Sequence, residues 1–376
     1  MAGAHGRVKR HSGGAGVAES HPPTADPLWV WAHDLPKIDL HRHLEGSLRL
    51  STMVELAEAH GIALPGADVE SLRPYVQVTD DPPGFQGFLD KFQILRRFYT
   101  SREAVQRIVR EAIADAVDDN VVYLELRFNP LALARVQQFK LGDVVAWVVA
   151  AAEAGQQETG MRTCLILQVP REEPLSVAHE IVDLAIAHWG SYVRGIDLAG
   201  NEVDYPPEDF AEPFARARRA GLHVTAHAGE ARGADSIRAA LVSLRPQRIG
   251  HGIRAIEDPR VVEMLRERGT TLEVCPTSNV HTGAVPAFRQ HPLVDLLRLQ
   301  LGVTLNTDDP SVSATTLSDE ILVAVKEMGL AVSLVYRMLR QSVEAAFIPE
   351  AERAGLRTRL RDALAARPGA SEAFEA

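Results

Sequence analysis

The chain has 376 residues, of which 46% are hydrophobic and 24% are charged, and its formal net charge is −10. This length suits one large α/β domain, and the composition is ordinary for a globular protein. An acidic chain is a poor partner for a phosphate backbone, which favours a basic face, so we expect a small-molecule substrate and no nucleic acid.

The first residues have the composition of a leader. Residues 1–27 are rich in Gly, Ala, Ser, Pro and His and contain a small basic cluster at Arg7, Lys9 and Arg10. No apolar stretch follows this cluster, which therefore resembles neither a secretory signal nor an anchor. We predict a disordered leader over 1–27 and a single domain over 28–376. No stretch approaches 18 consecutive apolar residues, so no membrane span is expected.

The first strand candidate, residues 37–43 (KIDLHRH), alternates apolar and polar side chains. In an extended segment alternate side chains share a face, so His41 and His43 project in the same direction. A periodic run after residue 47 predicts a helix that ends at Gly61.

Residues 83–100 differ from the segments around them because they place Phe85, Phe88, Leu89 and Phe92 on one stripe of a helix. This stripe is either a packing face or a lid over a site, since it lies in the long connection between the first two strand candidates. The sequence leaves these two interpretations open.

Strand and helix patterns then alternate along the rest of the chain. Helical runs such as LGDVVAWVVAAAEAGQQ and DPRVVEMLRERG fill most of the gaps between strands. The strand candidates are residues 37–43, 121–128, 163–169, 193–199, 223–229, 248–252, 271–276 and 302–308.

Eight strands separated by helices predict an α/β fold of the (β/α)8 TIM barrel type, with additional helices. The alternative, an open doubly wound sheet, usually carries a Gly-rich phosphate loop after its first strand, and no such loop is present here. In a barrel the functional site lies at the C-terminal ends of the strands. The candidate site residues below fall at those ends.

Cys164 and Cys275 are the two cysteines of the chain, and both lie in strand candidates. A disulfide framework is therefore not indicated, and we expect a reducing, cytoplasmic location.

Four potential metal ligands stand at strand ends. His41 and His43 share a face of the first strand, His227 ends the fifth, and Asp308 ends the last. Three neutral imidazole nitrogens and one carboxylate oxygen suit zinc and leave a position for water. An HxH pair alone is weak evidence, but the four together predict a metal site.

Three further candidates have structural alternatives. Glu230 and Asp309 could each cap a helix, and His251, flanked by Gly250 and Gly252, could be a packed histidine. Their position on the same predicted rim as the metal ligands favours a functional role for all three.

Seven motifs in this order resemble those of the adenosine deaminase family. The resemblance extends from about Pro36 to about Phe347, and the combination of HAGE, GHG and TDDP is highly specific. The motifs are HRHLEG (41–46), YLELRFNP (123–130), GIDLAGNE (195–202), HAGE (227–230), RIGHG (248–252), CPTSN (275–279) and NTDDP (306–310).

The resemblance implies that one zinc ion per chain is bound by His41, His43, His227 and Asp308. Asp308 and His251 would orient or deprotonate the attacking water.

The resemblance also implies contacts to a purine nucleoside. Glu230 would protonate ring N1, Asp309 would bond near N7, and the backbone N–H of Gly200 would contact N3. His43 and Glu45 would also line the substrate. The implied reaction converts adenosine or 2′-deoxyadenosine and water to the inosine product and ammonia, catalysed by a monomer or weak homo-oligomer.

One position departs from the family pattern, because Glu45 stands where adenosine deaminases usually carry an Asp that contacts the ribose 5′-hydroxyl. An extra methylene displaces the carboxylate by about a bond length. Relatives that act on adenine or aminodeoxyfutalosine can differ at this position, so both stay open as alternative substrates.

Other classes fit less well. Many amide and ester hydrolases of related barrels bridge two metals with a carboxylated Lys on the fourth strand, but RGIDLAG contains no Lys. The zinc motif of polynucleotide deaminases requires a CxxC that is absent here. A barrel without catalysis would lack some of the ligands, whereas every metal position and Glu230 are present.

Overall fold

The computed structural model describes residues 26–370 and residue 373, so the part of the predicted leader before Asp26 lies outside the described residues. Helix α1 begins at Pro27, one residue after Asp26, whose side chain caps the helix by accepting from the backbone N–H of Leu28 at 2.9 Å. Asp26 also pairs with Lys326. The last two residues of the predicted leader thus belong to the folded domain.

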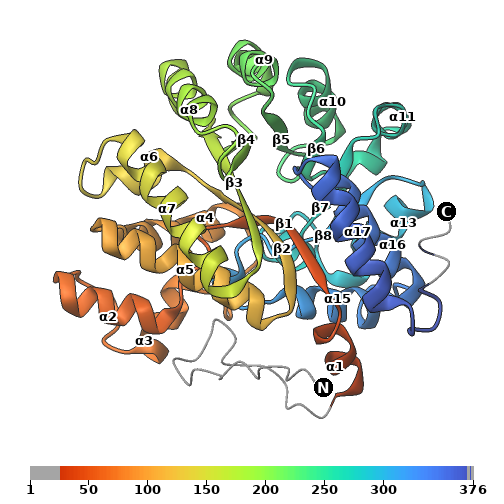
Figure 1. The fold of residues 1–376 in the computed structure, drawn as a ribbon, viewed down its shortest axis with the longest axis horizontal. Helices are drawn as coiled ribbons and strands as arrows, with labels where there is room; N and C mark the ends of the chain where they lie inside the picture. Colours follow the sequence, from red (N-terminus) through yellow and green to blue (C-terminus); the bar gives the residue numbers. More distant parts are fainter. Residues whose placement is uncertain (1–25, 371–372, 374–376) are drawn as a thin grey trace, which may run out of the picture.

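The predicted eight parallel strands are present and pair in the order β1 to β8 (Figure 1). An isolated bridge between Arg42 and Asp308 joins β1 to the segment after β8, so the barrel is nearly closed. The strands are β1 (Lys37–His43), β2 (Val121–Phe128), β3 (Arg162–Pro170), β4 (Val193–Ala199), β5 (His223–Ala228), β6 (Arg248–His251), β7 (Thr271–Val274) and β8 (Val303–Leu305).

Helices surround the strands, and Gly61 ends α2 in the left-handed conformation, as the sequence predicts. None of the described helices is long and apolar enough to cross a membrane. The α-helices are α1 (Pro27–His33), α2 (Leu50–His60), α3 (Val69–Val76), α4 (Phe85–Leu95), α5 (Arg102–Asp118), α6 (Pro130–Arg135), α7 (Leu141–Thr159), α8 (Leu175–Ala187), α9 (Ala211–Arg219), α10 (Ala234–Ser243), α11 (Pro259–Arg268), α12 (Pro276–His281), α13 (Leu293–Arg298), α14 (Pro310–Ser313), α15 (Leu317–Lys326), α16 (Val332–Ala345) and α17 (Glu350–Leu364).

The interior of the barrel holds paired charges as well as apolar side chains. Arg248 contacts Glu125 and Glu273 at 2.5 Å each, and Arg127 contacts Glu273 at 2.9 Å and Asp197 at 3.1 Å. All five side chains are buried. Because each buried charge has an opposite partner, the network avoids the large penalty of an isolated buried ion.

The last strand is shorter than the predicted one. Strand β8 ends at Leu305, and Asp308 adopts the left-handed conformation with φ of 61° instead of extending the alternation. The backbone N–H of His43 donates to the carbonyl of Asp308, and that of Asp308 donates to the carbonyl of His41, both at 2.8 Å. These bonds to β1 hold a conformation that non-glycine residues rarely adopt.

Glu320 on α15 yields a test of the packing around the barrel. Its carboxylate is buried and accepts from the backbone N–H of Thr277 at 3.1 Å and from the Thr315 hydroxyl at 3.0 Å. Burial raises the pKa of Glu320 to about 8 from its usual 4.5. The folded state therefore binds this proton more tightly than the unfolded state, and the stability linked to it is lost as the pH rises from about 4.5 to about 8.

We predict that Glu320→Gln removes this loss. Between pH 6 and pH 8 the free energy of unfolding of the wild type should fall by about 2 kcal/mol more than that of the variant, because one pKa unit corresponds to about 1.4 kcal/mol. Urea unfolding at a series of pH values measures the difference. Parallel curves for the two proteins would contradict a raised pKa at Glu320.

Candidate active site

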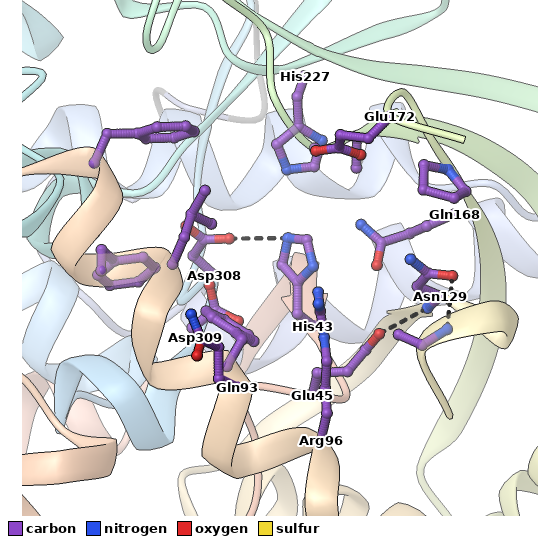
Figure 2. Close-up of a pocket in the computed structure, with 18 of the residues that line it drawn as sticks. His43, Glu45, Gln93, Arg96, Asn129, Gln168, Glu172, His227, Asp308 and Asp309 are labelled. Carbon is purple, nitrogen blue, oxygen red and sulfur yellow. Dashed lines mark hydrogen bonds and ion pairs between the residues drawn. The ribbon is translucent and has the colours of Figure 1, made fainter. Parts of the chain in front are cut away.

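A cavity of about 650 Å³ lies at the C-terminal ends of the strands (Figure 2). Every predicted site residue except His41 lines it, and His41 lies close to three of the lining residues, His227, His251 and Asp308. The polar residues that line the cavity include His43, Glu45, Asn129, Gln168, Glu172, His227, Glu230, His251, Asp308 and Asp309.

Helix α4 forms an apolar wall of this cavity. Phe85, Phe88, Leu89 and Phe92 all line it, and Phe88 and Phe92 are also largely buried in the core. The stripe predicted from the sequence is therefore both a packing face and a wall of the site. Because these side chains carry no polar atoms, the wall suits the apolar faces of an aromatic ligand.

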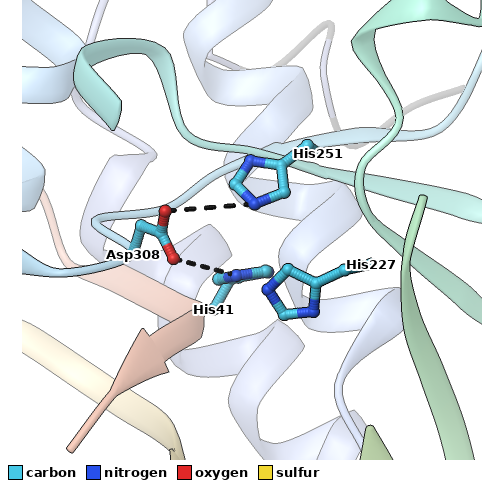
Figure 3. Close-up of side chains that lie close together, drawn as sticks. All are labelled: His41, His227, His251 and Asp308. Atoms are coloured by element: carbon cyan, nitrogen blue, oxygen red, sulfur yellow. Dashed lines mark ion pairs between the residues drawn. The ribbon is translucent and has the colours of Figure 1, made fainter. Parts of the chain in front are cut away.

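Four side chains bring possible metal-binding atoms together. One atom from each of His41, His227, His251 and Asp308 lies within 4.8 Å of the others (Figure 3). His43 adjoins this group, since its Nε2 lies 3.2 Å from His41 Nε2 and 3.0 Å from Asp308 Oδ1. The structure therefore unites the four predicted metal ligands and adds His251 to the same cluster.

Buried carboxylates set the orientation of two of these imidazoles. Nδ1 of His41 lies 2.7 Å from Glu273, and Nδ1 of His227 lies 3.1 Å from Asp197. His227 and Arg127 outweigh burial and hold the pKa of Asp197 well below its usual range, and Arg127 and Arg248 do the same for Glu273. Ionised carboxylates only accept, so each Nδ1 carries the hydrogen, and each Nε2 lone pair is available on the other side.

The cluster favours a positive charge at its centre. His41 Nε2 lies 3.1 Å from Asp308 Oδ1, so a nitrogen lone pair and a carboxylate oxygen meet. Burial lowers the pKa of His227 to about 3. It also acts on His43, but the carboxylates of Asp309 and Asp308 outweigh it and raise the pKa of His43 to about 9. Several acceptors and a strong preference for positive charge fit a divalent cation held by nitrogen and oxygen ligands.

The three acidic residues of the site have different protonation states. Burial raises the pKa of Glu230 to about 7. Burial and the charge of Asp308 raise the pKa of Asp309 well above its usual range, whereas the neighbouring imidazoles of His41 and His43 outweigh burial and hold the pKa of Asp308 well below its usual range. At neutral pH Asp308 is therefore ionised, Asp309 retains its proton to a higher pH than Asp308 does, and Glu230 can give or take a proton.

His251 has a fixed orientation as well. The amide of Asn279 donates to its Nδ1 at 3.0 Å, so the neutral ring carries its hydrogen on Nε2. This Nε2 lies 3.4 Å from Glu230 and 3.9 Å from Asp308. Gly250 is needed here, because a Cβ at that position would lie 2.9 Å from the ring of His41.

The remaining predicted residues lie on the cavity wall. Gly200 has φ of 105°, and the carboxylate of Glu172 lies against it and accepts from the Asn201 N–H at 2.5 Å. Glu45 is buried, and its Oε1 accepts from the Asn129 N–H at 2.9 Å. Its Oε2 has no hydrogen-bond partner among the described residues. Glu45 thus carries a buried oxygen that the described residues leave unpaired.

Sequence analysis does not identify the supporting residues. Asp197, Glu273 and Asn279 orient the imidazoles, and Glu202 accepts from four consecutive N–H groups of the loop at 229–232. The sequence nevertheless contains a signal for three of them, because Asp197, Glu202 and Asn279 lie inside the motifs that carry the family resemblance. Glu273 lies outside these motifs.

Asp197→Asn tests the orientation of His227. Oδ2 of Asp197 accepts from Arg127 and from Gln168, so an Asn would keep its oxygen on that side and turn its NH2 group toward His227. The hydrogen of His227 would then move to Nε2, and the lone pair would be lost from the cluster. We predict about 10- to 100-fold weaker binding of a divalent cation, measured by competition with a metallochromic chelator.

Asp183→Asn, at an exposed position of α8, is the matched control and should leave the affinity unchanged. Equal affinities of wild type and Asp197→Asn would show that Asp197 does not control the metal site.

Comparisons with known proteins agree with this geometry. A family model described as adenosine deaminase matches residues 36–363. The chain is 37% identical over 329 residues to an adenosine deaminase from Vibrio parahaemolyticus, an alignment that covers 88% of this chain and 98% of that protein.

Two solved structures are also similar. The first is an adenine deaminase from Arthrobacter aurescens, with a TM-score of 0.82, 31% identity, and coverage of 88% of this chain and 100% of that one. The second is an amidohydrolase from Burkholderia ambifaria with bound Zn, with a TM-score of 0.82, 27% identity, and coverage of 93% and 98%.

Proposed function

The chain belongs to the adenosine deaminase family, and from this premise we propose that it catalyses the zinc-dependent hydrolytic deamination of adenosine and 2′-deoxyadenosine, with release of ammonia. One observation carries the proposal: a cluster of potential metal ligands, a carboxyl group with a pKa of about 7 and a second carboxyl group with a raised pKa meet at the same cavity. Together they offer the groups needed to add water to an aromatic ring and expel an amine.

We assign the zinc ligands to His41, His43, His227 and Asp308. The donor set of nitrogens and one carboxylate supports zinc, as does the bound Zn of the Burkholderia amidohydrolase. Zinc held there supplies the Lewis acidity that makes a water molecule acidic enough to lose a proton near neutral pH.

Two groups handle the proton of the attacking water. The ionised carboxylate of Asp308 accepts it, and the Nε2–H of His251, 3.9 Å from Asp308, orients the water oxygen toward C6 of the purine. Asn279 keeps the hydrogen of His251 on this side of the ring. Both groups are buried, so bulk water competes little for these contacts.

Glu230 supplies a proton to ring N1. As oxygen bonds to C6, the C6–N1 π electrons move to N1, and the proton from Glu230 prevents negative charge from accumulating there. The amine then leaves as ammonia with the proton that Asp308 took from the water, and the C6 hydroxyl returns its proton to Glu230 as it becomes a carbonyl. A carboxyl group with a pKa of about 7 suits this exchange, because it can donate and be restored at the same pH.

Asp309 and Gly200 position the base. Asp309 lines the cavity, and its raised pKa favours the protonated form, so we assign it to donate to N7; its Oδ1 is buried and has no partner among the described residues. Gly46 permits this arrangement, because a Cβ there would lie 1.9 Å from Asp309 Oδ1. The N–H of Gly200 is assigned to N3.

The free Oε2 of Glu45 supports a nucleoside substrate, because a 5′-hydroxyl would satisfy it. Adenine is the second candidate, which the similarity to the Arthrobacter adenine deaminase favours. A free base would leave the Glu45 oxygen without a partner, so we place adenosine first.

Glu230→Gln tests the acid. The amide cannot donate a proton to N1, so we predict that turnover slows by roughly a hundredfold or more while the zinc content stays unchanged. Ammonia release and metal analysis on the same preparation measure the two quantities. Turnover at the wild-type rate would remove Glu230 from this role.

A substrate panel tests the choice of aminopurine. We predict that the zinc-loaded protein has a higher kcat/KM for adenosine than for adenine or aminodeoxyfutalosine, measured as ammonia release. A preference for adenine would retain the mechanism and assign the change in specificity to Glu45. If none of the three compounds released ammonia, the result would contradict the proposed function.

A further inference from the structure

Two side-chain amides on the cavity wall have no part in the chemistry at the base. Gln168 lies on β3, and Asn129 follows β2 directly. The two strands pair with Phe128 opposite Leu167, so Asn129 and Gln168 are the next residues along this register. Figure 2 shows both amides on the same side of the cavity, above Glu45.

The orientation of the Gln168 amide is fixed by its partner. Its Nε2 donates to Asp197 Oδ2 at 3.2 Å, and the ionised carboxylate can only accept. The amide oxygen of Gln168, Oε1, must therefore be the atom that does not contact Asp197. Gln168 is only 4% exposed, and no described residue donates a hydrogen bond to its Oε1. A buried acceptor without a protein partner thus stands on the cavity wall.

The Asn129 amide has the complementary orientation. Its Oδ1 accepts from the backbone N–H groups of Leu131 and Ala132, at 3.0 and 3.2 Å, and so caps α6. Nδ2 is therefore the atom left for the cavity, and it donates to no acceptor among the described residues. A donor and an acceptor, each fixed by the protein, lie side by side.

We propose that Gln168 and Asn129 form a subsite for the vicinal 2′- and 3′-hydroxyls of a ribonucleoside. The inference rests on the proposed function, which assigns the base to Glu230, Gly200 and Asp309 and leaves the wall at the ends of β1 to β3 for the sugar. One hydroxyl donates to Gln168 Oε1, and the other accepts from Asn129 Nδ2.

This subsite distinguishes ribonucleosides from their deoxy analogues. A substrate that lacks one hydroxyl leaves a polar atom of the wall without a partner in a site from which water is largely excluded. We therefore expect the enzyme to accept 2′-deoxyadenosine and 3′-deoxyadenosine, but with lower kcat/KM than adenosine by roughly tenfold for each missing hydrogen bond.

The test compares kcat/KM for these three nucleosides in the zinc-loaded wild type and in two variants. Gln168→Met removes the acceptor and retains the length of the side chain. Asn129→Ser keeps an oxygen that can cap α6 and removes the amide group that reaches the cavity. Each variant should lose roughly tenfold on adenosine and little on the deoxy analogue that already lacks the corresponding hydroxyl. Gln86→Met on α4, outside the cavity, is the matched control and should change none of the three values.

Equal losses on all three nucleosides would overturn the proposal, because they would show that the variants act through Asp197 or the α6 cap. Unchanged kcat/KM in both variants would overturn it as well. Wild-type protein that deaminates no nucleoside would instead refute the proposed function, whereas active wild type without discrimination among the three refutes only the sugar subsite.

Discussion

The pairing of Arg127 with Asp197 and Glu273 is the interaction on which the rest of the site depends. Its guanidinium contacts both carboxylates and donates to the carbonyl of Leu40 at 2.7 Å, so one cation spans the centre of the barrel. Asp197 contacts Arg127 through Oδ2 and the imidazole of His227 through Oδ1. Glu273 contacts both Arg127 and the imidazole of His41 through Oε2. Without the guanidinium, two buried negative charges would lie together and would favour protonation instead.

Protonated carboxyl groups would no longer be obligate acceptors, and the hydrogens on Nδ1 of His41 and His227 would then be free to move to Nε2. The lone pairs that face the cluster therefore depend on a charge located deeper in the barrel. This dependence explains why a TIM barrel, whose interior is usually filled by branched apolar side chains, holds a charged network here. The charged network replaces apolar packing in the barrel interior, and it fixes which nitrogen of His41 and of His227 carries the hydrogen.

The three acidic residues of the active site differ in pKa because each has a different environment. Asp308 and Asp309 are adjacent in the chain, yet the imidazoles of His41 and His43 lie against the first and lower its pKa, whereas the second is buried beside a negative charge that raises its pKa. Two identical side chains thus have pKa values shifted in opposite directions, which suits the first to accept a proton and the second to donate one. Glu230 lies between these extremes because burial is only partly offset by His251.

Much of this architecture could be predicted from the sequence, because strand periodicity and strand ends are local properties. The alternation in KIDLHRH places His41 and His43 on one face, and the barrel then requires His227 and Asp308 to meet them at the same rim. The left-handed turn at Asp308 could not be predicted, because the hydrogen bonds to β1 that hold it are long-range. Asp197 and Glu273 could not be identified for a related reason: inside a strand they look like ordinary polar positions until their partners are known.

The orientation of a side-chain amide is the clearest case of information that a sequence lacks. Asn129 and Gln168 have the same functional group, yet one offers a donor and the other an acceptor, since a helix cap fixes the first and Asp197 fixes the second. Asp197 consequently anchors both His227 in the metal cluster and Gln168 in the sugar wall. Reaction and substrate selection thus share one carboxylate, Asp197, whereas the amide of Asn129 is held by a local helix cap that has no part in the metal cluster.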